Sequence, residues 1–276
     1  GVKSLPDFLK DATDRNRTSP FAFTGNKFEF RMVGSKDSVS SPNVVLNTIA
    51  AEAFSEACDI LEKADNFDEA VRSLIQQQAT AHQRIIFNGN GYSEEWVEEA
   101  ERRGLPNITS MVDAIPALTS EKAVALFEKF HVLTRTELKS REEVSYEAYA
   151  KAINIEARAM INITGKQLIP AMIQATTDLG NSVANLKPIA IDTSVQEILL
   201  KEITDCLIRA KTALTSLQRV TAEGAEMKEG RKQAVFYHDF VVSAMEELRA
   251  PIDQVERIIK KDIWPMPSYG DLLFEV

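Results

Sequence analysis

From about residue 43 onward, apolar residues recur at intervals of three and four positions among Glu, Lys, Ala and Gln. This spacing places the apolar side chains on one face of an α-helix. The pattern therefore predicts a mainly α-helical chain. The expected helices cover residues 43–63, 67–86, 93–103, 120–130, 135–182, 194–228 and 231–262.

Residue chemistry at the ends of these segments supports several of the boundaries. Thr134 and Ser194 are each followed three residues later by a glutamate, the pattern of a capping box at a helix start. Gly104 with a following proline predicts the end of one helix, and Pro188 predicts the end of another.

The last two predicted helices each carry a continuous apolar series, so we expect them to form an antiparallel hairpin with its turn near residues 224–230. The segment 135–182 is expected to complete a long-helix bundle with left-handed packing. Gly165 and Pro170 predict a kink in that segment. Pro251 is expected to bend or restart its helix.

Before residue 34 the pattern changes to one of alternation. Lys27, Glu29 and Arg31 are separated by single phenylalanines, which in a β-strand puts the three charges on one side and the rings on the other. Such a face suits a polyanionic substrate held beside a metal ion. It also fits an exposed strand whose surface ion pairs have no functional role. Because an isolated pair of strands is only marginally stable, we expect a larger sheet upstream and interpret the chain as the C-terminal part of a longer polypeptide.

Charge and composition exclude several classes of protein. The net charge of −9 leaves no concentrated basic face for nucleic acid or anionic lipid, and only the first 45 residues are slightly cationic. No apolar run approaches the roughly 18 residues of a membrane span, and no secretory signal is evident, so we expect a soluble cytoplasmic protein with no membrane partner. Cys58 and Cys206 lack metal-ligand spacing and are expected to be reduced packing residues.

Other motifs have structural readings that compete with functional ones. The Asn-Gly pairs in 87–91 are expected to form a turn rather than a phosphate-binding loop. The three histidines, His82, His131 and His238, have no second ligand at metal spacing. His238 and Asp239 are not expected to form a dyad, because adjacent residues on a helix point about 100° apart.

The opening segment resembles the signature of the glutamine synthetase family, in particular its long type III branch. The resemblance is carried by Asn16-Arg17-Thr18, Lys27-Phe28-Glu29-Phe30-Arg31 and Ser41-Pro42-Asn43, by the segment Arg84 to Trp96, and by the ending Trp264 to Phe274. It implies that residues 1–90 close a catalytic α+β domain, of which the β-segment is a remnant, and that residues 91–276 form a helical C-terminal domain.

The resemblance also implies an activity and residue roles. The reaction would be ATP-dependent ligation of ammonia to L-glutamate through a γ-glutamyl phosphate, in a large ring-like homo-oligomer. Glu29 would be a ligand of Mg²⁺ or Mn²⁺, and Arg31 would hold glutamate and the acyl phosphate. Arg17 would face the transferred phosphoryl group, and Lys27 would contact the nucleotide. The fragment alone would be inactive.

One departure and two alternatives accompany this interpretation. Ala22 and Phe23 stand where the family pattern has a second arginine. A non-enzymatic helical oligomerisation or interaction module would use the bundle 135–262 to bind a partner. A ligase that joins glutamate to an amine other than ammonia would share the same anchor residues.

Overall fold

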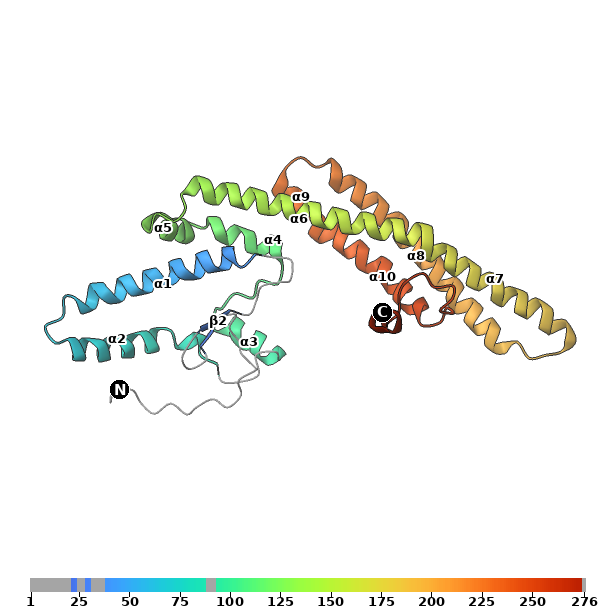
Figure 1. Cartoon of the computed structure of the whole chain (residues 1–276), viewed down its shortest axis with the longest axis horizontal. Coiled ribbons are helices and arrows are strands. Elements are labelled where there is room, and N and C mark those ends of the chain that lie inside the picture. Colours follow the sequence, from blue (N-terminus) through green and yellow to red (C-terminus); the bar gives the residue numbers. More distant parts are fainter. Residues whose placement is uncertain (1–20, 24–27, 31–37, 88–92, 275–276) are drawn as a thin grey trace. The chain divides into compact units, whose positions relative to one another are not determined.

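The computed structural model describes residues 21–23, 28–30, 38–87 and 93–274, which are mainly helical (Figure 1). The chain divides into two compact units, Gly1–Leu138 and Lys139–Val276. This division differs from the domain border expected at residues 90–91. A compact unit is defined by contacts within this chain alone, so the border of a catalytic domain in a longer protein stays a prediction.

The first unit combines two short strands with helices of moderate length. Its elements are β1 (Phe21–Phe23), β2 (Phe28–Phe30), α1 (Ser40–Leu61), α2 (Phe67–Ala81), η1 (Gln83–Ile85), α3 (Glu94–Arg102), α4 (Met111–Ala114), η2 (Ile115–Thr119) and α5 (Glu121–Lys129). Helix α1 packs against both α2 and α5. Val124, Phe127 and Leu138 form a small buried cluster, against which Val45 of α1 packs.

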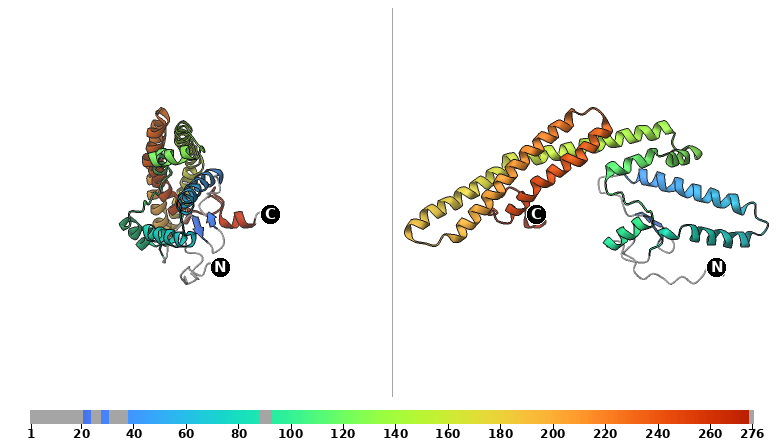
Figure 2. Two further views of the ribbon diagram at one scale, coloured as in Figure 1. Left: turned by 90° about the vertical axis from the view of Figure 1, so that its left-hand side faces the viewer. Right: turned by 180° about the vertical axis from the view of Figure 1, so that it is seen from behind.

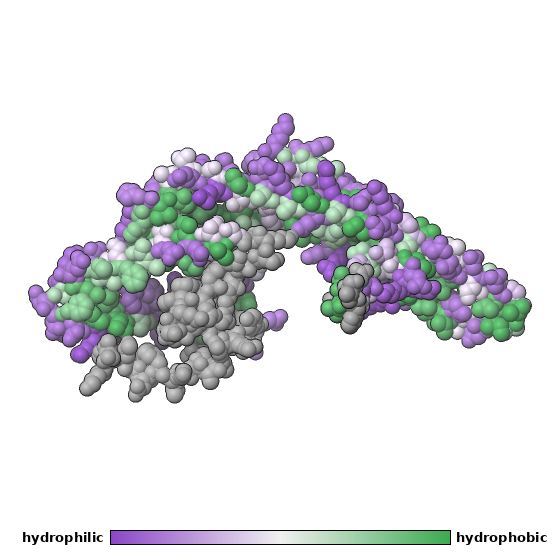
Figure 3. Space-filling view, viewed as in Figure 1, coloured by the Kyte–Doolittle hydropathy of each residue, from purple (hydrophilic) through white to green (hydrophobic). Residues whose placement is uncertain are grey.

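Much apolar surface of this unit stays exposed. Phe54 of α1 is 72% exposed and Phe67 of α2 is 60% exposed. Hydrophobic residues reach the visible surface in the region of α1 and α2 (Figure 3). Large exposed apolar side chains that gather on one face often mark a surface that another protein segment covers.

The second unit is a bundle of long helices. Its elements are most of α6 (Arg135–Ile163), the π-helical turn η3 (Thr164–Leu168), α7 (Ile169–Leu186), η4 (Lys187–Ile189), α8 (Ser194–Glu226), α9 (Gly230–Phe236), the π-helical turn η5 (Tyr237–Val242), α10 (Ser243–Glu256) and α11 (Tyr269–Phe274). Both α7 and α10 lie beside α8 (Figures 1 and 2). The expected hairpin of the last two long helices is therefore confirmed, with its turn between α8 and α9.

One continuous core holds these helices together. Its most deeply buried members come from every long helix of the unit, namely Ala157, Met172, Ile203, Leu217, Val241, Leu248 and Val255. Burying an aliphatic side chain of this size contributes about 1.5–3 kcal/mol relative to leaving it exposed. The periodic apolar series of the sequence is thus the surface on which the bundle packs. Among the described residues, no helix combines the length and apolar character that crossing a membrane requires.

A π-helical turn lies where the sequence predicts a kink, near Gly165. Residues 164–168 adopt the wider turn, and α7 begins directly after it with Pro170 in its first turn. Proline has no N–H to donate and crowds the preceding turn, so a local change of hydrogen-bond pattern accommodates it. Pro251 lies inside α10, which continues through it without a restart.

Two of the predicted helix-end signals are present in the structure. The Thr134 N–H donates to Glu137 Oε2 at 2.8 Å and the Glu137 N–H donates to Thr134 Oγ1 at 3.3 Å, which confirms that capping box. Gly104 has φ +67°, and the Leu105 N–H donates to the Ala100 carbonyl at 2.9 Å, so the expected glycine stop is confirmed.

The second predicted capping box, Ser194 with Glu197, does not form. Ser194 is the first residue of α8 rather than its cap, and Thr193 occupies the cap position. Thr193 Oγ1 donates to Glu197 Oε1 at 2.9 Å, while the Ser194 N–H donates to Asp192 Oδ1 at 2.9 Å. A run of adjacent polar residues offers several capping oxygens, and spacing alone does not distinguish between them.

Candidate functional site

The alternating segment of the sequence contributes an antiparallel pair of strands. β1 and β2 pair in the register Phe21 with Phe30, Ala22 with Glu29, and Phe23 with Phe28. Glu29 therefore lies at the centre of β2, directly opposite Ala22. Arg17, Lys27 and Arg31 lie outside the described residues, so their predicted roles stay predictions.

This register concerns Ala22, one of the two residues that stand where the family pattern has a second arginine. In an antiparallel pair, residues directly opposite each other are close neighbours on one face of the sheet. The position opposite Glu29 carries an alanine, which brings no charge to the carboxylate.

The described residues contain no cluster that resembles a metal site. No group of three or more His, Cys, Asp or Glu side chains with the geometry to hold a metal ion occurs among them. A single carboxylate such as Glu29 is a hard oxygen donor that suits Mg²⁺ or Mn²⁺ as one ligand among several. Glu29 is therefore chemically suited to bind such an ion, but further ligands would be needed to complete the coordination of the ion.

His238 and Asp239 do meet, contrary to the prediction. The Nδ1 atom of His238 lies 2.7 Å from Asp239 Oδ1. Both residues belong to the π-helical turn η5, and both side chains are substantially exposed, so they are free to turn toward each other across neighbouring positions. Because the pair lies on the surface, the contact does not by itself make a catalytic dyad.

The two cysteines differ in their surroundings. Both are free thiols, as expected, but only Cys206 is buried, whereas Cys58 is exposed on α1 and is therefore not the packing residue that we expected. Burial raises the pKa of the Cys206 thiol. A buried thiol with a raised pKa is a poor nucleophile, and Cys206 is accordingly a packing residue of the core.

A cluster that the sequence did not reveal forms around Arg103. The rings of Phe87 and Trp96 stack with centroids 4.1 Å apart, and the Arg103 guanidinium lies 5.9 Å and 5.6 Å from these two centroids. Arg103 Nη1 also donates to the Arg84 carbonyl at 3.2 Å and to the Ile86 carbonyl at 2.7 Å. These contacts tie the end of the segment 83–87 to α3.

Glu99 orients this arginine. Its carboxylate pairs with both Arg102 and Arg103, and the hydrogen bond with Arg103 is the main reason that the pKa of Glu99 is lowered. The residues involved are up to 19 positions apart, and no periodic pattern connects them. The cluster fixes both sides of the segment 88–92, within the stretch that carries part of the family resemblance.

Comparison with known proteins adds independent information. A family model described as the glutamine synthetase C-terminal domain matches residues 70–187. The type-3 glutamine synthetase of Dictyostelium discoideum is 37% identical over 99% of this chain. Glutamine synthetases of Butyrivibrio fibrisolvens and Bacteroides fragilis (strain YCH46) are 34% and 31% identical over 98% and 99% of it.

The similarity covers nearly all of this chain but only part of each relative. The aligned regions make up 38% of the Dictyostelium protein and 39% of each bacterial one. The matching family model describes a C-terminal domain. The chain therefore belongs to the glutamine synthetase family, in which it corresponds to a C-terminal portion of the type-3 proteins.

Proposed function

We propose that this chain is part of an enzyme that joins ammonia to the γ-carboxylate of L-glutamate at the expense of ATP. The observation that carries the proposal is the 37% identity to a type-3 glutamine synthetase, which extends over 99% of the chain and so includes the opening segment. In this reaction a γ-carboxylate oxygen attacks the terminal phosphorus of ATP and ADP leaves. Ammonia then attacks the carbonyl carbon of the γ-glutamyl phosphate, phosphate leaves, and the nitrogen loses a proton.

The opening segment would supply one wall of the active site. Arg31 would bind the glutamate carboxylate and the acyl phosphate, and Arg17 would face the phosphoryl group in transfer. A guanidinium suits both tasks because it donates two parallel hydrogen bonds with fixed geometry. Lys27 would contact the nucleotide as a mobile point charge. These cations would stabilise the negative charge that spreads over the phosphoryl oxygens in the transition state.

Glu29 would be one ligand of a divalent cation, Mg²⁺ or Mn²⁺, near the centre of this wall. Such an ion neutralises charge on the nucleotide phosphates when it is bound. The hard carboxylate oxygen of Glu29 fits this role, and Ala22 opposite it leaves the carboxylate without a protein cation from β1. The remaining ligands would come from other segments of the longer protein, so this chain alone would not catalyse the reaction.

The exposed surface of the first unit supports a larger assembly. Two three-residue strands do not make an independent sheet, and the small cluster around Phe127 is a modest core for this unit. The exposed phenylalanines of α1 and α2 would be covered by the remainder of a catalytic domain that ends near residue 90. The whole protein would act in the cytoplasm as a ring-like homo-oligomer.

The test uses the full-length protein that contains this sequence. Glu29→Gln should reduce glutamine formation at least about 100-fold, as does the loss of a group that stabilises transition-state charge, and should weaken activation by Mg²⁺ or Mn²⁺. Arg31→Ala should reduce kcat and raise the KM for glutamate. Circular dichroism should show an unchanged fold in both variants.

Matched controls come from exposed residues of the first unit. Glu62→Gln removes an exposed carboxylate after α1, and Arg72→Ala removes an exposed guanidinium on α2. Both should keep normal activity. If Glu29→Gln or Arg31→Ala also had normal kinetics, the residue assignment would be wrong. If the full-length protein formed no glutamine but turned over with methylamine, a ligase for another amine would replace the proposal.

A further inference from the structure

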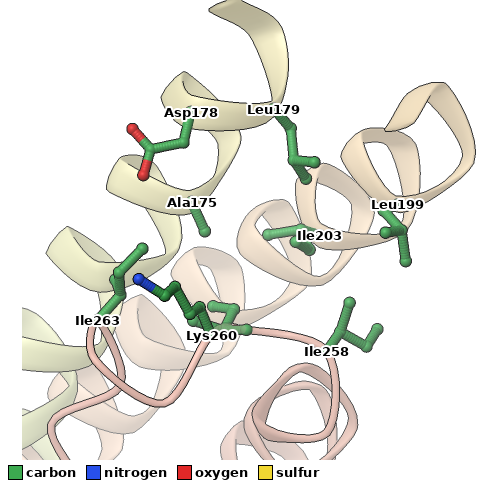
Figure 4. A pocket seen from close by; sticks show the side chains of 9 residues that line it. Ala175, Asp178, Leu179, Leu199, Ile203, Ile258, Lys260 and Ile263 are labelled. Carbon is green, nitrogen blue, oxygen red and sulfur yellow. The ribbon is translucent and has the colours of Figure 1, made fainter. Parts of the chain in front are cut away.

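A small cavity opens in the second unit, between α7, α8 and the segment that follows α10. It has a volume of about 230 Å³. Its apolar lining consists of Ala175, Leu179, Leu199, Ile203, Ile258, Ile259 and Ile263, and its charged lining of Asp178 and Lys260 (Figure 4). A mostly apolar hollow with a few convergent polar groups is the usual form of a small-molecule site.

The two charged side chains lie at one edge of this hollow (Figure 4). Gln174 Nε2 donates to Asp178 Oδ1 at 2.8 Å in a solvent-exposed hydrogen bond on α7. Lys260 Nζ lies 2.6 Å from Asp262 Oδ2, and Asp178 adds to the negative field around it. The edge thus carries an anion and a cation, both exposed to solvent, beside an aliphatic floor.

The segment that carries Lys260 is held in place before any ligand arrives. Trp264 Nε1 donates to Glu256 Oε1 at 2.9 Å, and the Trp264 N–H donates to the Lys260 carbonyl at 3.1 Å. The Trp264 side chain is only 8% exposed and belongs to the same core as α7 and α8. A wall fixed in this way lowers the entropy cost of binding.

Volume and charge together define the occupant. At about 30 Å³ for each water of the liquid, the cavity has the volume of about eight waters, so its ligand has few non-hydrogen atoms. The aliphatic floor requires a branched hydrocarbon group. The edge requires an ammonium for Asp178 and a carboxylate for Lys260. We propose that this cavity binds a free aliphatic α-amino acid of the leucine type, with its side chain on the isoleucines and its charged groups between Asp178 and Lys260.

The experiment titrates L-leucine into the 276-residue chain and, in parallel, into the full-length protein. Binding is followed by calorimetry and by the fluorescence of Trp264, which adjoins the cavity residue Ile263. We expect saturable binding to both proteins. Isopentylamine, which lacks the carboxylate, and 4-methylpentanoate, which lacks the ammonium, should each bind at least tenfold more weakly, a loss of about 1.4 kcal/mol.

Variants of the two charged residues test the geometry. Asp178→Asn and Lys260→Gln should each weaken leucine binding at least tenfold. Asp253→Asn and Lys232→Gln are the matched controls, since each removes one charge from an exposed ion pair away from the cavity, and both should bind leucine normally. Ala175→Leu, which fills the floor, should abolish binding if circular dichroism shows that it folds.

Three results would overturn the proposal. The first is no saturable binding of leucine to the chain at millimolar concentration. The second is equal loss in the cavity variants and their controls. The third is binding to the chain but not to the full-length protein, which would mean that another segment of the protein fills the cavity. None of these outcomes depends on glutamine formation, so this inference and the proposed function can fail separately.

Discussion

Replacing Gly224 tests how tightly the C-terminal end of α8 packs against the helix that returns beside it. A Cβ atom at this position would lie 3.2 Å from Phe236 Cδ1 and 3.2 Å from both Tyr237 Cε2 and Tyr237 Cζ. The Tyr237 ring is only 1% exposed, so it has little room to withdraw. The Gly224 carbonyl also accepts a hydrogen bond from Gln233 Nε2 at 2.9 Å, which holds the two segments together.

Two opposing terms set the size of the effect. Alanine is favoured over glycine in a helix interior by about 1 kcal/mol. Overpacking a well-filled site costs about 1–3 kcal/mol. Gly224→Ala should therefore destabilise the second unit by about 0–2 kcal/mol. Gly180 of α7 provides the matched control, because a Cβ there meets nothing within 4 Å, and Gly180→Ala should stabilise by about 0.5–1 kcal/mol.

The assay is urea unfolding of both variants, followed by circular dichroism and by Trp264 fluorescence. The midpoint should fall for Gly224→Ala and rise for Gly180→Ala, with an unchanged slope showing that the effect is on stability. The free energies of unfolding of the two variants should differ by about 0.5–3 kcal/mol. If Gly224→Ala were as stable as Gly180→Ala, the close approach at Gly224 would not be a real constraint.

Three further predictions concern the arginine cluster, the C-terminal helix and the thiols. Arg103→Ala should destabilise the first unit by about 1–2 kcal/mol, seen in Trp fluorescence on unfolding, because it removes cation–π contacts and two hydrogen bonds to carbonyls. Hydrogen bonds from Lys261 and from the backbone and hydroxyl of Ser268 together lower the pKa of Asp271 to about 2, and the bond from Lys261 contributes most. The ionised Asp271 carboxylate should thus contribute its full stabilisation above the ordinary pKa of 3.8, and this stabilisation should be lost as pH falls toward 2. Lys261→Gln should raise the pKa of Asp271, as measured by NMR. Cys58 should react with a thiol reagent at once, whereas Cys206 should react only on unfolding, and equal rates for the two would contradict their different burial.

The candidate site shows that sequence alone can identify site residues when they lie close together in one short segment. Glu29 and its neighbours were recognised because their spacing in the sequence is the spacing on one strand. What the strand pair adds is the register, which places Ala22 opposite Glu29. That neighbour could not be inferred from spacing, because the cross-strand register depends on the turn between the strands.

The sequence by itself determined the helices, several of their ends and the family. Periodicity, the capping pair at Thr134 and the glycine stop at Gly104 act within a few residues, so they can be recognised in the sequence without any tertiary contact. Only the tertiary structure decided the π-helical turns, the cluster around Arg103 and the cavity edge at Asp178 and Lys260. These features join residues many positions apart through packing and charge. Packing depends on which helix faces contact each other in the folded chain, and the local conformational preferences of the residues do not specify those contacts.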